Sequence, residues 1–86
     1  MPKPDKNSNN KNLISHKLIA LRQQHGLSQR DLARKLQIAG YDIDKNVITR
    51  IETNKRHVSD IELRALKEIF DITYEELLRP EQEEFV

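Results

Sequence analysis

The chain has 86 residues, no cysteine and a formal net charge of +1, and 36% of its residues are hydrophobic. This length allows one small domain that buries only about 60% of its unfolded surface, and the lack of cysteine excludes disulfides and thiolate metal sites. No apolar run is long enough for a membrane span or a secretory signal, so we expect a soluble, cytoplasmic protein.

Charge is distributed unevenly along the chain. Residues 1–12 carry three lysines against one aspartate (net +2), residues 13–58 carry nine Lys and Arg against four acids (+5), and residues 59–86 carry three against nine (−6). The basic first two thirds favour a polyanionic partner, whereas ordinary scatter of surface charge is an equally good explanation of the totals alone.

The first twelve residues have the composition of a flexible basic arm. They include two prolines and four asparagines, and almost no apolar side chain whose burial would offset the entropy of ordering. Lys3, Lys6 and Lys11 either lie along the phosphates of a polyanion or have no role. We therefore place the folded domain at residues 13–79 and an acidic tail at residues 80–86.

Two helices with apolar faces are expected next. The first spans residues 13–25, from a cap at Asn12 to Gly26, which can take the left-handed conformation that ends a helix. The capping pair Ser28–Asp31 then begins a second helix that runs to about residue 39. Their inward side chains recur at helical spacing: Ile14, Leu18 and Leu21, then Leu32, Ala33 and Leu36.

A third helix is predicted over residues 45–53. Gly40 ends the second helix, and Asp44 is a suitable cap for the third. Asn54 follows at a turn position where positive φ is commonly needed, and asparagine tolerates it best after glycine. The helix has one apolar face, Val47, Ile48 and Ile51, and one polar face, Lys45, Asn46, Thr49 and Arg50.

Two further helices complete an all-α chain. Ser59–Glu62 is a capping box, and an apolar face follows it: Ile61, Leu63, Leu66, Ile69 and Phe70. Thr73–Glu76 repeats the device before a short fifth helix with Leu77 and Leu78 inward, which Pro80 ends. No period-two alternation predicts a strand, so the expected fold class is all-α with five helices.

This pattern resembles the helix-turn-helix DNA-binding domain of the lambda Cro and repressor family, often called XRE-type, over about residues 13–78. The matching motifs are Leu18-x-x-Leu21-Arg22, Gly26-Leu27-Ser28-Gln29, Leu32-Ala33, Ile48-x-x-Ile51-Glu52, Ser59 through Leu66, Ile72-Thr73 and Glu76-Leu77. The resemblance implies a compact five-helix, lambda-repressor-like domain that lays its third helix in the major groove of double-stranded DNA as a homodimer on a two-fold operator. The expected function is that of a sequence-specific transcriptional regulator, a repressor.

The chain departs from the family pattern at two places. Gln37–Asp42 adds roughly five residues to the usual tight turn between the second and third helices. We expect an extra helical turn that Gly40 closes, with Tyr41 and Ile43 packing back. The second departure is Asn54, where the family more often has glycine.

The resemblance places four side chains toward the bases: Lys45, Asn46, Thr49 and Arg50. Arg50 can form two hydrogen bonds with guanine and Asn46 two with adenine, each pair being worth about 1–3 kcal/mol of discrimination. Lys45 and Thr49 are more adaptable. A solvated polar face on an amphipathic helix would look the same in isolation.

Five other residues are expected to contact DNA phosphates: Gln29, Thr53, Asn54, Lys55 and Arg56. Gln29 begins the second helix and the others follow the third, where His57 is a further, weaker candidate. An N-terminal helix residue and an exposed basic loop are the plain alternatives. Arg22 and Glu52 match a pair that bridges the first and third helices in the family, so we assign them a structural salt bridge.

Enzymatic chemistry finds little support in the sequence. The chain has only two glycines and no phosphate-cradling loop, and His16, His25 and His57 lack metal-ligand spacing. Asp42 and Asp44 have carboxylates for a cation, but Asp44 is better explained as a cap. We expect no enzyme, no metal, no cofactor, no small-molecule substrate and no membrane partner.

A protein-interaction module is the alternative function. The same scaffold would then serve an antitoxin-like or adaptor role, with a protein partner held by the last two helices. Its contact surface would come from these side chains: Leu63, Leu66, Phe70, Tyr74, Phe85 and Val86.

Overall fold

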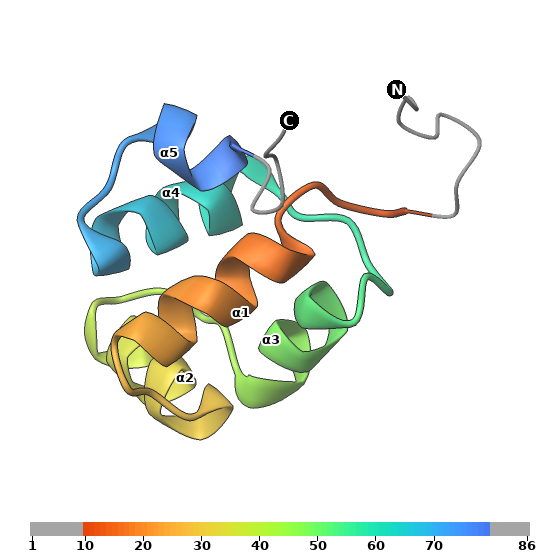
Figure 1. The fold of residues 1–86 in the computed structure, drawn as a ribbon. Coiled ribbons are helices and arrows are strands. Elements are labelled where there is room, and N and C mark those ends of the chain that lie inside the picture. The colour runs from red at the N-terminus through yellow and green to blue at the C-terminus, as the bar shows by residue number, and fades with distance from the viewer. Residues whose placement is uncertain (1–9, 80–86) are drawn as a thin grey trace.

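Five helices form over residues 10–79, the part of the chain that this computed structural model describes (Figure 1). They are α1 (Ser15–Gln24), α2 (Gln29–Ile38), α3 (Lys45–Glu52), α4 (Asp60–Phe70) and α5 (Tyr74–Leu78). No strand occurs among these residues, which confirms the all-α prediction. None of the helices described is long and apolar enough to cross a membrane. The predicted tail at 80–86 and most of the predicted arm lie outside the described residues.

Side-chain caps begin four of the helices where the sequence predicts them. The Ser28 hydroxyl accepts a hydrogen bond from the Asp31 amide at 3.0 Å, and the Asp31 carboxylate accepts one from the Ser28 amide at 3.2 Å. Ser59–Glu62 forms the same reciprocal box, while Asp44 and Thr73 cap α3 and α5. The Ser28 backbone N–H lowers the pKa of the Asp31 carboxyl, because it donates to the charged form.

The predicted cap of the first helix is wrong. The helix begins at Ser15 rather than residue 13, and the Asn12 side chain makes no cap to it. Instead, the Asn12 amide nitrogen donates to the carbonyl oxygens of Ile51 and Arg56, and its oxygen accepts from the Ile14 amide. Residues 10–12, which the sequence assigns to a flexible arm, are therefore hydrogen-bonded to the end of α3.

The long connection between α2 and α3 closes as the sequence predicts. Gly40 adopts φ +101°, and its N–H donates to the carbonyl of Gln37, while the N–H of Tyr41 donates to that of Leu36. This paired pattern at a left-handed residue is the Schellman motif that ends helices. Beyond it, Tyr41 packs against the core and Ile43 is buried, so the added residues are part of the fold.

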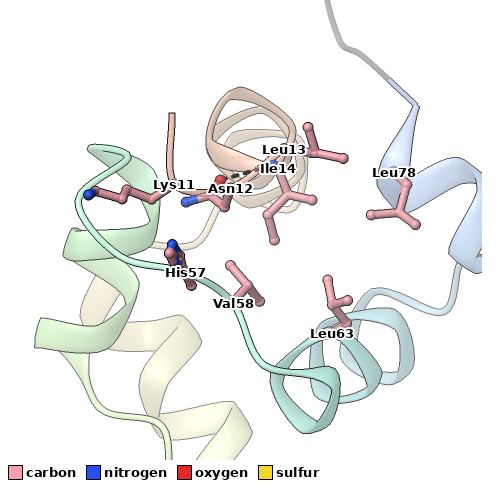
Figure 2. Close-up of a pocket in the computed structure, with 8 residues that line it drawn as sticks. All are labelled: Lys11, Asn12, Leu13, Ile14, His57, Val58, Leu63 and Leu78. Atoms are coloured by element: carbon pink, nitrogen blue, oxygen red, sulfur yellow. Dashed lines mark hydrogen bonds between the residues drawn. The ribbon is translucent and has the colours of Figure 1, made fainter. Parts of the chain in front are cut away.

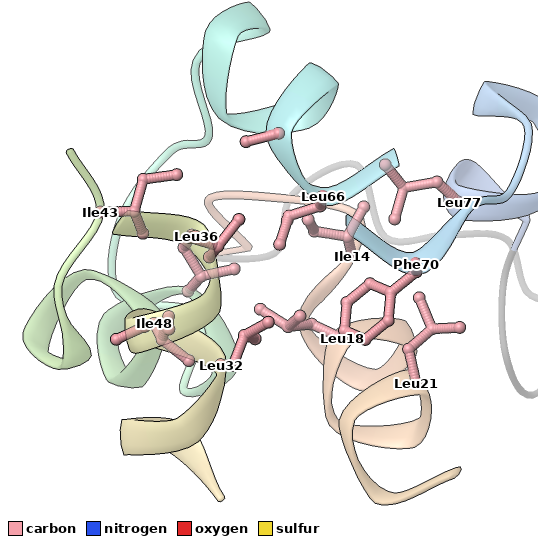
Figure 3. Packing of buried hydrophobic residues seen from close by; sticks show 13 residues of the cluster. Ile14, Leu18, Leu21, Leu32, Leu36, Ile43, Ile48, Leu66, Phe70 and Leu77 are labelled. Carbon is pink, nitrogen blue, oxygen red and sulfur yellow. The ribbon is translucent and has the colours of Figure 1, made fainter. Parts of the chain in front are cut away.

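The core lies where all five helices meet (Figure 3). It consists of thirteen buried side chains: Ile14, Leu18, Leu21, Leu32, Ala33, Leu36, Ile43, Ile48, Ile51, Ala65, Leu66, Phe70 and Leu77. Burying one leucine or isoleucine fully stabilises the fold by about 1.5–3 kcal/mol. Since Ile48 and Ile51 belong to this cluster, the opposite face of α3 must lie at the surface.

Candidate nucleic-acid interface

The outward face of α3 carries three exposed polar side chains, Lys45, Asn46 and Arg50, which we call the outer row. The helix is held in this orientation by Ile48 and Ile51, which are 0% and 1% exposed. Within residues 10–79 no side chain hydrogen-bonds or forms an ion pair with a side chain of the outer row. Their donors and acceptors are therefore available to a ligand.

Thr49 and Gln29, both expected to contact DNA, instead contact each other. The Thr49 hydroxyl lies 2.8 Å from the Gln29 amide oxygen and 3.0 Å from the carbonyl of Lys45, so it donates to one of these. The Gln29 amide nitrogen donates to the Glu52 carboxylate at 2.8 Å. Both residues are half-buried between α2 and α3. Their polar groups are already engaged inside the protein.

The predicted ion pair between Arg22 and Glu52 is present. Arg22 Nε and Nη2 donate to the two oxygens of Glu52 at 2.7 and 3.1 Å, and Nη1 donates to the carbonyl of Leu27. The side chains are 16% and 4% exposed. Together with Gln29 and Thr49 they form a connected network that we call the polar seam. It joins the end of α1, the start of α2 and the body of α3, so it fixes the angle of α3.

The residues after α3 differ in whether their side chains form hydrogen bonds or ion pairs within the protein. Arg56 donates to both oxygens of Glu62 at 3.0 Å, so its positive charge is paired with a carboxylate within the fold. The Asn54 side chain faces residues 10–12, and the Thr53 hydroxyl donates to the carbonyl of Thr49. Lys55 is exposed and has no carboxylate partner among residues 10–79. It is the best placed of the predicted phosphate contacts.

Two cations that sequence reasoning missed lie beside the outer row. Arg30 and Arg34 are exposed on α2 and, with Lys45 of α3, line a shallow surface hollow. Their spacing of four residues places both side chains on one helix face, and that spacing was the available signal. The hollow extends the positive surface from the start of α3 onto α2.

A second hollow lies where residues 11–14 pass the loop after α3 (Figure 2). One end is polar, with Lys11, Asn12 and His57, whereas the other end is apolar, with Leu13 and Leu78. The Lys11 side chain points away from these leucines.

The surface expected for a protein-interaction module does not form as predicted. Leu66 and Phe70 are 1% and 4% exposed, because they pack in the core and not on the surface. Leu63 is half-buried and Tyr74 is exposed, and the other two predicted residues lie outside the described part. No cluster of three or more His, Cys, Asp or Glu that could hold a metal ion occurs in residues 10–79. The Asp44 carboxylate caps α3.

Comparisons with known proteins agree with this geometry. The helix-turn-helix family model matches residues 18–77, whereas a comparison with curated protein sequences gives no match. The solved DNA-binding domain of BldD is 28% identical, with a TM-score of 0.67 over 84% of this chain and 97% of that domain.

A second similar structure is a hypothetical transcription factor, NHTF, from Neisseria. It has a TM-score of 0.72 over 95% of this chain and 87% of that one, and its 18% identity shows a shared fold alone. The family match spans well over half of the sequence. The chain therefore belongs to the Cro/C1-type helix-turn-helix family, whose members are DNA-binding transcriptional regulators and not enzymes.

Proposed function

We propose that this protein represses transcription by binding a specific duplex sequence, with α3 in the major groove. One observation carries the proposal: the outer row is exposed and uncommitted, while the other face of the same helix is core. A helix of this diameter fits the major groove of B-DNA, where base edges present a distinct pattern for each base pair. The similarity to the DNA-binding domain of BldD supports the same interpretation.

Base contacts are assigned first to the outer row. Arg50 and Asn46 suit guanine and adenine, respectively, and Lys45 is an adaptable donor. We assign Thr49 to the polar seam and not to a base, because its hydroxyl hydrogen is already donated within the protein. Discrimination at the bases therefore depends on three side chains, and the polar seam holds the helix that presents them.

Phosphate contacts are assigned to exposed cations around α3. Lys55 lies just beyond its end, and Arg30 and Arg34 lie beside its start. Four predicted phosphate contacts are not assigned, because their side-chain donors are hydrogen-bonded within the fold: Gln29, Thr53, Asn54 and Arg56. Counterion release at each neutralised phosphate makes the affinity depend on salt.

A homodimer on a two-fold operator is part of the proposal. The eight residues of α3 span about 12 Å, so one copy contacts only a few base pairs. Two copies on half-sites about 34 Å apart double the sequence that is discriminated. Repression follows because a bound dimer excludes other proteins from the same duplex. The proposed location is the cytoplasm, because the protein must share a compartment with its operator.

Selection of bound duplexes from a random pool tests the proposal directly. We expect enrichment of a two-fold sequence, binding by two copies in sedimentation analysis, and blocked transcription in vitro from a promoter that carries the site. A flat pool together with no duplex affinity in dilute buffer would overturn the proposal. Enrichment of a single half-site bound by one copy would overturn the dimer.

A further inference from the structure

We propose that Asn54 is a positioning residue that holds Lys11 beside Lys55, and that these two lysines together contact one DNA phosphate segment at the end of α3. The inference rests on the proposed function, because it adds a contact to the same interface. It also reassigns Asn54, which the sequence predicts as a phosphate contact in its own right.

The hydrogen bonds around Asn54 fasten the start of the described chain to α3. Its side-chain oxygen accepts from the backbone N–H of Lys11 at 2.8 Å and of Asn12 at 3.1 Å, and its amide nitrogen donates to Asn10. The Asn12 side chain adds bonds to the carbonyls of Ile51 and Arg56 at 3.2 and 3.0 Å. These contacts join segments 39 to 44 positions apart in the sequence.

The backbone of Asn54 explains why its side chain can make these bonds. Asn54 has φ +60°, and the N–H groups of Asn54 and Lys55 donate to the carbonyls of Ile51 and Arg50. Glycine would satisfy the positive φ equally well but has no side chain to bind residues 10–12. An asparagine at this position therefore ends the helix and also holds the N-terminal segment.

The bonds place the backbones of two lysines just beyond the end of α3. Lys11 is held through its backbone by Asn54, and Lys55 is the next residue after Asn54. Both lysines are exposed, and no carboxylate within residues 10–79 pairs with either. In Figure 1 the segment around residues 10–14 passes the loop that follows α3. A helix in the major groove has phosphates beyond its end, and two lysines there suit that polyanion.

Three variants test the inference on the selected duplex: Lys11→Gln, Asn54→Gly and the double variant. Lys11→Gln should lower the slope of log affinity against log salt by about 0.9, the value for one phosphate contact. Asn54→Gly keeps the positive φ, so the protein should stay folded yet lose most of the same slope. The double variant should lose less affinity than the sum of the two single losses, because both substitutions remove the same phosphate contact. Arg79→Gln, an exposed cation after α5, is the matched control and should leave the slope unchanged.

The outcomes separate this inference from the proposed function. If the unaltered protein binds no duplex, the proposed function fails. If it binds but Lys11→Gln leaves the salt slope unchanged, only the Lys11 contact fails. Fully additive losses in the double variant would show that Asn54 does not act through Lys11. Without DNA, Asn54→Gly should speed amide hydrogen exchange at Lys11 and Asn12, and unchanged exchange would contradict the positioning role.

Discussion

The outer row and the polar seam lie on the same short helix and its neighbours, and both are built from polar side chains. The outer row has no side-chain partner in the described protein, whereas every member of the polar seam bonds to another member. Removing a seam residue therefore strands a partner inside the fold, while removing an outer-row residue affects only a ligand. Side chains that are hydrogen-bonded within the protein therefore hold α3 in place, whereas side chains without such partners are exposed for a ligand.

Glu52→Ala should give the largest effect, because it strands the Arg22 charge and also removes the acceptor of Gln29. Breaking a buried pair costs about 3–5 kcal/mol. For a domain of this size the Tm should fall by more than about 12 °C, or cooperative unfolding should be lost. Calorimetry or circular dichroism measures the change.

Glu75→Ala is the control for this prediction, because it removes an exposed carboxylate from the first turn of α5. Its loss should cost about 1 kcal/mol or less. A Tm shift for Glu52→Ala no larger than that of the control would contradict the seam as the element that holds α3.

Arg50→Ala should give the next largest effect, and on binding rather than on stability. Loss of a bidentate contact should cost about 1–3 kcal/mol, and the preference at one base pair of the operator should flatten. Lys55→Ala should weaken all duplexes alike, because a phosphate contact carries no sequence information. Anisotropy titrations against the operator and its single-base variants measure both. Equal losses on every duplex from both variants would refute the assignment of Arg50 to a base.

Gln29→Ala and Thr49→Val should give smaller effects that are coupled. The two side chains share one hydrogen bond, so the double variant should be less destabilised than the sum of the singles by about 0.5–1.5 kcal/mol. Urea unfolding measures the coupling. Thr49→Val should leave the base preference unchanged, and a shifted preference would move Thr49 from the polar seam to the outer row.

Local chemistry in the sequence was enough to predict most of the fold. The Ser28–Asp31 and Ser59–Glu62 boxes are decided within four residues, so the starts of α2 and α4 follow from the sequence alone. The apolar periods identify the core side of each helix with two exceptions, since Ile61 and Leu78 of the predicted apolar faces are 61% and 40% exposed. The predicted positive φ at Gly26, Gly40 and Asn54 depends on a single residue each.

The hydrogen-bond and ion-pair partners of polar side chains on different helices were harder to predict. Arg56 pairs with Glu62, which the sequence already assigns to a cap, and Gln29 meets Thr49 twenty positions away. Such pairs depend on how helices are placed relative to one another, which no local pattern specifies. The polar pattern therefore predicted which face of α3 is exposed, but not which of its side chains are hydrogen-bonded within the fold.

Asp31 supplies the smallest effect, because its carboxylate is hydrogen-bonded but lies at the surface. The Ser28 backbone N–H, followed by the Ser28 hydroxyl, lowers its pKa in the folded protein. A folded pKa below the unfolded value means that the charged form stabilises the fold above about pH 4 and that this stabilisation is lost as pH falls through the folded pKa. Asp31→Asn should therefore have a lower Tm than the unaltered protein near neutral pH, and the difference should vanish in acid. If the difference in Tm stays constant across the pH series, the charge of Asp31 makes no contribution to stability. A side chain that is fully hydrogen-bonded within the fold would then not, for that reason alone, be one that holds its helix.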